Sequence, residues 1–223
     1  MSIDDPDMQR PVCFWNSGGL EPTTSQKRAR EIMGTNFFGV EEAIQHFGIN
    51  PSKAQTNTLA EVPFSEAVLA THKDTHILVA VFPMSILDIR GKVEHQLFHS
   101  HENAWYNKEK FAKGKGEVGW HLVRKTPVPD SINKTWSEQQ ALLTETEETP
   151  TTQVMVYTIT GHFLATGERL FKDVYVRCSD LGSFGLRVNA GFFVANGLCL
   201  CYWVDDRDSF IGLSASLKFQ AEN

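Results

Sequence analysis

The chain is poor in cysteine, and its few cysteines form no recognisable framework. Its 223 residues include four cysteines and no CxxC pair, whereas disulfide-stapled domains and zinc ribbons need more numerous or more closely spaced cysteines. Cys199 and Cys201 alternate along an apparent strand. We therefore expect reduced, mostly buried thiols.

Long apolar runs are also missing. No stretch approaches the roughly 20 consecutive apolar residues that cross a bilayer. The opening residues, MSIDDPDMQRPVCFW, carry acids where a secretory signal needs positive charge. These two absences predict a cytoplasmic protein with no membrane partner.

Positive charge is in short supply. The chain has 21 Lys and Arg against 27 Asp and Glu, a formal net charge of −6 and a pI near 5.7, whereas generic polyanion binders are usually basic overall. No GxSxG elbow, HExxH motif or P-loop is present. The sequence thus carries no complete catalytic signature, and its 41% hydrophobic content indicates one sizeable core.

The N-terminal part of the chain is predicted to be helical. Residues 1–24 resemble a loosely ordered arm, and 25–223 read as a single domain with a possible internal boundary near 145–150, where the acidic link ETEETP lies. Apolar spacing and capping residues predict helices over 36–48, 51–60 and 65–73. The continuous apolar run ILVAVF then predicts a strand buried on both faces.

Strands dominate the C-terminal part. We expect a strand at 120–124, a helix opened by the capping-box pair Thr135 and Glu138, and a segment at 154–165 that fits either state but favours a helix. Asn196-Gly197 between apolar runs predicts a type I′ hairpin. The predicted fold class is α+β, with N-terminal helices followed by a mainly antiparallel sheet that ends in a C-terminal β-meander.

A histidine cluster, EHQLFHSHE, is a candidate metal site. On a helix, His95, His99 and Glu102 would share one face, whereas on a strand His95, His99 and His101 would do so. Either set could hold a divalent metal such as zinc, with Glu94 as general base of a hydrolase-like enzyme. The alternative, which we favour, is a group of ordinary polar histidines beside aromatic side chains.

Residues 105–125 combine lysines with aromatic side chains, so they form the preferred candidate surface. Through this surface, we expect the protein to act as a non-catalytic binding module that contacts an unknown protein or small-molecule partner. Nucleic-acid binding through the same residues is a further reading, not favoured in an acidic chain. The residues of this candidate surface are Trp105, Tyr106, Lys108, Lys110, Lys113, Lys115, Trp120 and Arg124.

Two further patterns have a structural and a functional interpretation. Residues 41–60 resemble a helix-turn-helix unit, which would imply DNA binding, but Lys53 is the only cation on the would-be recognition helix and ordinary helix packing is favoured. Asp205, Asp206 and Asp208 could hold a hard cation. We favour the interpretation that they cap a solvated turn at the end of the meander.

Overall fold

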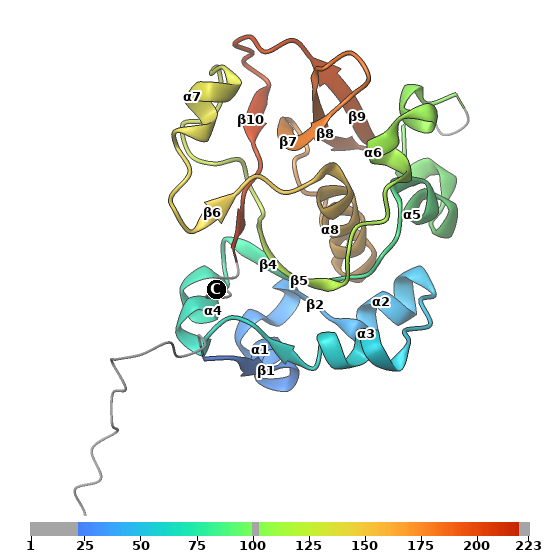
Figure 1. The fold of residues 1–223 in the computed structure, drawn as a ribbon, viewed down its shortest axis with the longest axis vertical. Helices are drawn as coiled ribbons and strands as arrows, with labels where there is room; N and C mark the ends of the chain where they lie inside the picture. Colours follow the sequence, from blue (N-terminus) through green and yellow to red (C-terminus); the bar gives the residue numbers. More distant parts are fainter. Residues whose placement is uncertain (1–21, 100–102, 219–223) are drawn as a thin grey trace, which may run out of the picture.

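The computed structural model describes residues 22–99 and 103–218, and they form layers around one central helix (Figure 1). A five-stranded sheet lies on one side of this helix and a four-stranded sheet on the other. Helices α1, α3 and α4 cover the far side of the five-stranded sheet (Figure 1). The fold is α+β, as the sequence predicts.

In chain order, the helices are α1 (Gln26–Met33), α2 (Val40–Phe47), α3 (Lys53–Thr58), α4 (Glu66–His72), α5 (Ile86–Lys92), α6 (Lys110–Lys113), α7 (Trp136–Gln140) and α8 (Thr152–Thr166). Short 3-10 helices span Gly34–Asn36, His95–Leu97 and Trp105–Lys108. The strands are β1 (Thr24–Ser25), β2 (Phe37–Phe38), β3 (Glu61–Val62), β4 (His76–Val81), β5 (Gly119–Arg124), β6 (Glu147–Glu148), β7 (Tyr175–Leu181), β8 (Arg187–Val194), β9 (Gly197–Trp203), β10 (Ile211–Leu213) and β11 (Ser216–Leu217).

Helix α8 is the centre of the molecule. Every residue of Thr152–His162 is buried, so the helix has no polar face and must be enclosed. It packs against β2 and β4 on one side and against β7 and β8 on the other. Thr151 caps its first turn and Gly167 ends it in the left-handed conformation. The helical interpretation of 154–165 is therefore confirmed.

The five-stranded sheet has the order β2-β4-β5-β11-β6. Its central strand β4 is buried at all six residues, which confirms the strand predicted from ILVAVF. Strand β11, from the end of the described chain, lies between β5 and β6. The link near 145–150 thus contributes a strand to this sheet.

The four-stranded sheet has the order β10-β7-β8-β9. Strands β7, β8 and β9 form the predicted antiparallel meander, while β10 pairs with β7 in parallel. The turn between β8 and β9 differs from the prediction. Gly197 has a φ of +96°, but Asn196 is not among the residues with positive φ. A type I′ turn needs both residues at positive φ, so that assignment was wrong.

The N-terminal helices are shorter than predicted at their starts. The helix expected over 36–48 begins only at Val40, because Phe37–Phe38 pairs with β4 as strand β2. The helix expected over 51–60 begins at Lys53, capped by Ser52. The third is confirmed, with Ser65 as its cap. No helix among the described residues is both long and apolar enough to cross a membrane.

Close packing between α8 and β2 yields a stability prediction. A methyl group at Gly161 would lie 2.9 Å from Cζ of Phe38, a ring that is itself buried. We expect Gly161→Ala to lower the free energy of unfolding by about 1–3 kcal/mol, because overpacking outweighs the gain in helix propensity. Urea unfolding measures this change.

The matched control is Gly91→Ala in α5, where the new methyl group meets no atom within 4 Å. There the same substitution should raise the free energy of unfolding by up to about 1 kcal/mol. Equal effects at the two glycines would refute the close packing of α8 against Phe38.

Candidate functional site

The aromatic residues of the predicted 105–125 surface are mostly structural. Tyr106 is 2% exposed and Trp120 is 7% exposed. The indole of Trp105 donates a hydrogen bond of 2.8 Å to the carbonyl of Leu200 and packs on Tyr202 at 4.6 Å between ring centroids, so it covers the edge of β9. The expectation of an exposed aromatic surface here was wrong, because the rings are used to close the fold.

The basic residues of this segment do not converge either. Lys108, Lys110, Lys113 and Lys115 are exposed, and Lys115 lies 3.6 Å from Asp88. Arg124 lies apart from them on β5, where it contacts Glu147 at 3.4 Å within the five-stranded sheet. What remains of the predicted surface is a set of solvated lysines.

The histidine cluster is only partly described. His101 and Glu102 lie outside the described residues. His95 and His99 are both exposed, and the 3-10 helix that holds His95 ends at Leu97, so the two share neither a helix face nor a strand face. Among the described residues, no three or more His, Cys, Asp or Glu side chains are grouped to hold a metal. The zinc site and the role of Glu94, an exposed residue, stay predictions.

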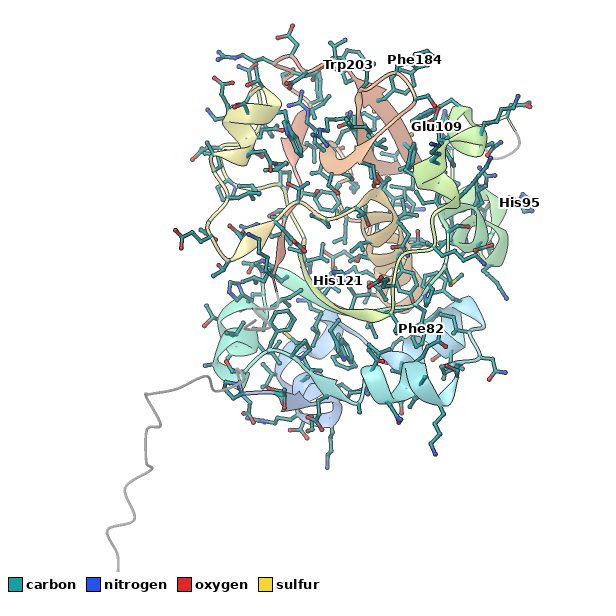
Figure 2. The ribbon with its side chains drawn as sticks, in the orientation of Figure 1. Phe82, His95, Glu109, His121, Phe184 and Trp203 are labelled. Carbon is teal, nitrogen blue, oxygen red and sulfur yellow. The ribbon has the colours of Figure 1, made fainter. Side chains whose placement is uncertain are left out.

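Two other histidines, His76 and His121, lie deeper in the fold. Figure 2 shows His95 at the outer edge of the molecule, whereas His121, on β5, is half-buried. His76 is 1% exposed on β4 and its ring lies 4.5 Å from that of His72. Burial, together with the charges of His72 and Arg124, lowers the pKa of His76 to about 3, and burial lowers the pKa of His121 to about 4. Both rings are therefore neutral in the folded protein near neutral pH.

This burial predicts loss of stability in mild acid. In the unfolded chain His76 takes up a proton near pH 6.5, whereas in the fold it does so only near pH 3. The stabilisation is complete above pH 6.5 and is lost as the pH falls towards 3, by about 2 kcal/mol at pH 5. The free energy of unfolding of His76→Gln should depend less steeply on pH between 6.5 and 4. If the free energy of unfolding of the native chain and of His76→Gln changed equally with pH, the assignment of a buried, neutral His76 ring would be contradicted.

The segment that resembles a helix-turn-helix unit has a short second helix. Helix α3 has six residues and buries none of them, while α2 packs against α8. Lys53 is the first residue of α3. Because α3 buries none of its residues, the interpretation of this pair as ordinary helix packing stays a prediction, and so does nucleic-acid binding.

A buried arginine, missed by sequence reasoning, organises the outer face of the four-stranded sheet. Arg177 of β7 is 0% exposed. Its Nη1 donates to the carbonyl of Lys134 at 2.8 Å and to Oε1 of Gln139 at 3.0 Å, and its Nη2 donates to the carbonyl of Asp206 at 2.6 Å. It thereby fastens both α7 and the loop after β9 to the sheet.

The acidic turn, which we define as 204–210, balances this charge. Burial lowers the pKa of Arg177, while the charges of Asp205, Asp208 and Asp206 oppose that shift. All three carboxylates also accept from backbone amides: Asp205 Oδ1 from that of Trp136 at 2.6 Å, Asp206 Oδ1 from that of Arg207 at 2.7 Å, and Asp208 Oδ1 from that of Phe210 at 2.7 Å. The capping interpretation of these acids is confirmed.

Removal of this arginine should be costly. Arg177→Ala leaves the buried Oε1 of Gln139 and the partly buried carbonyls of Lys134 and Asp206 without their donor, so we expect the free energy of unfolding to fall by about 3 kcal/mol or more. The control is Arg207→Ala, since Arg207 pairs with Glu138 at the surface and exposed pairs contribute little. Comparable midpoints in urea for the two variants would show that Arg177 does not anchor the turn.

The acidic turn forms one wall of a pocket on the outer face of the four-stranded sheet. Its volume is about 220 Å³. Tyr175 and Phe192 lie 4.6 Å apart between ring centroids, and Phe192 and Phe210 lie 6.2 Å apart. Phe192 has a φ of +44°, a strained conformation for an aromatic residue. The pocket, called the aromatic pocket below, is lined by Tyr175, Phe192, Cys201, Trp203, Asp208, Phe210 and Ile211.

Exposed apolar side chains surround the aromatic pocket. Phe210 is 58% exposed and Trp203 is 47% exposed, and Val204 follows at 54%. Phe184, 77% exposed on the β7–β8 hairpin, lies at the same end of the molecule as Trp203 (Figure 2). Glu109 anchors this hairpin, because its Oε2 accepts bonds from Ser183 N and Oγ at 2.9 and 2.8 Å.

The thiols near this pocket are protonated. Burial raises the pKa of Cys201 to about 11, and it raises the pKa of Cys199 as well. A thiol in this state is a poor nucleophile. The pocket therefore offers aromatic faces and one carboxylate, Asp208, and no activated nucleophile.

The chain matches no known family model, no curated protein and no solved structure. The strand alternation noted for Cys199 and Cys201 extends to Trp203: on β9, Leu198 and Leu200 are buried while these three residues occupy the other face.

Proposed function

We propose that this protein is a non-catalytic binding module whose contact surface is the aromatic pocket and its exposed rim. The observation that carries the proposal is the gathering of Trp203 and Phe210, both exposed, at the mouth of a pocket. Soluble proteins seldom expose large apolar side chains together without a contact role, and aromatic residues are the commonest anchors of binding energy.

The pocket is already shaped for binding. The network of Arg177 and the bond from Asp208 to the amide of Phe210 hold the acidic turn in place. A wall held in this way loses little conformational entropy when a partner binds. This preorganisation supports a binding role for the C-terminal sheet in place of the 105–125 surface.

We place the module in the cytoplasm. Cys178, Cys199 and Cys201, the cysteines among the described residues, are all free. Free thiols accord with a reducing compartment. The partner is a protein, because the exposed rim extends beyond the pocket itself.

The test compares partner capture by three forms of the full chain. Trp203→Ser with Phe210→Ser removes the two exposed rings, and Ile44→Ser changes an apolar residue of α2 that is 44% exposed. Proteins captured from lysate by the native chain and by the Ile44→Ser variant should be lost with the double variant. Capture that survives the double variant, with the fold verified by circular dichroism, would refute the proposed surface.

A further inference from the structure

The aromatic pocket has the chemistry of a cation site. Four of its lining residues are aromatic, one is a carboxylate and none is cationic. Ring faces carry negative electrostatic potential and attract cations, most strongly where several rings surround a charge of low hydration. On this basis, and resting on the proposed function, we propose that the aromatic pocket binds the trimethylated side chain of a lysine on a partner protein.

The rings are arranged around a common space. The planes of Tyr175 and Phe192 are inclined by 44°, and those of Phe192 and Phe210 by 58°, so their faces turn in different directions. Trp203 and Asp208 line the same space. Its volume of about 220 Å³ corresponds to roughly seven water molecules at about 30 Å³ each, which is ample for a trimethylammonium group.

The charge around the pocket favours a cation. Asp208 is half-buried in the wall, and one of its oxygens already accepts the Phe210 amide. Asp205 and Asp206 flank it in the turn. Arg177 opposes them, but its guanidinium is fully buried and donates to Gln139 and two backbone carbonyls. Arg207 of the same turn is paired with Glu138, and Arg187, across from Trp203, stacks on the ring of Trp136. The three carboxylates around the enclosed guanidinium therefore leave an excess of negative charge at the pocket wall.

The pocket favours a methylated ammonium over an unmodified one. A primary ammonium has three N–H donors that need acceptors when it leaves water. The walls provide few acceptors beside Asp208, since the other lining residues are mostly rings. Methyl groups need no acceptor, spread the charge and pack directly on ring faces.

A second hollow argues for a polypeptide as the source of the cation. It has a volume of about 230 Å³, and its lining includes Trp136, Leu181, Arg187 and Asp205. Arg187 is the register partner of Trp203, and Trp203 lines the aromatic pocket. The two hollows are therefore neighbours on this end of the sheet. A chain that places one side chain in the aromatic pocket can rest its flanking residues in the second hollow.

The experiment titrates the full chain with three N-acetylated, C-amidated short peptides, followed by NMR shifts of the amides in 199–210. The peptides are identical except for one residue, which is trimethyllysine, its uncharged tert-butyl analogue or unmodified lysine. We expect trimethyllysine to bind at least about tenfold more tightly than the other two. Phe210→Ala and Asp208→Asn should each weaken binding of the trimethyllysine peptide severalfold. The Asn side chain retains the oxygen that accepts the hydrogen bond from the Phe210 amide.

The matched control is Ile44→Ala, an exposed apolar residue of α2 outside the pocket and its rim, which should leave the affinity unchanged. Equal affinity for the uncharged analogue would overturn the cation assignment but leave the proposed binding function standing. Choline that binds as tightly as the trimethyllysine peptide would overturn the polypeptide source. Failure of all three peptides to shift these amides would overturn the inference, while the partner-capture test would still decide the proposed function.

Discussion

The enclosure of α8 is the constraint on which the rest of this structure depends. A helix without a polar face is stable in water only if other elements cover it on every side, and here two sheets together with α2, α5 and α6 do so. Several of the polar side chains it carries have hydrogen-bond partners, among them Gln153, Thr158 and His162. Gln153 Nε2 donates to the carbonyl of Met84 at 2.9 Å, and His162 Nε2 pairs with Glu168 at 2.8 Å.

This enclosure determines where a site can lie. Both sheets turn their apolar faces towards α8, so their opposite faces must be covered separately. Helices α1, α3 and α4 cover the five-stranded sheet (Figure 1). Among the described residues, the outer face of the four-stranded sheet is partly covered by α7, the loop before it and the acidic turn, which Arg177 fastens to the sheet. The aromatic pocket lies beside this partial cover.

Local chemistry could be predicted from the sequence, and pairing between distant segments could not. Ser65 and Thr135 act as helix caps where they were expected, because capping depends on residues three positions apart. The parallel pairing of Phe37–Phe38 with β4 depends on contacts some 40 residues away. The same limit explains the error at Trp105 and Trp120. An aromatic residue is equally suited to a core and to a contact surface, and only strand pairing decides which role it has.

The buried arginine and the pocket are parts of one arrangement. Arg177 is enclosed without a direct carboxylate partner, so its charge is offset only by the three aspartates of the turn. Those aspartates must stay close to it, and this requirement fixes the backbone that carries Phe210. The aspartates that stabilise the buried charge of Arg177 also supply the negative charge of the aromatic pocket. A residue buried for the stability of the sheet therefore also determines the geometry of the binding surface.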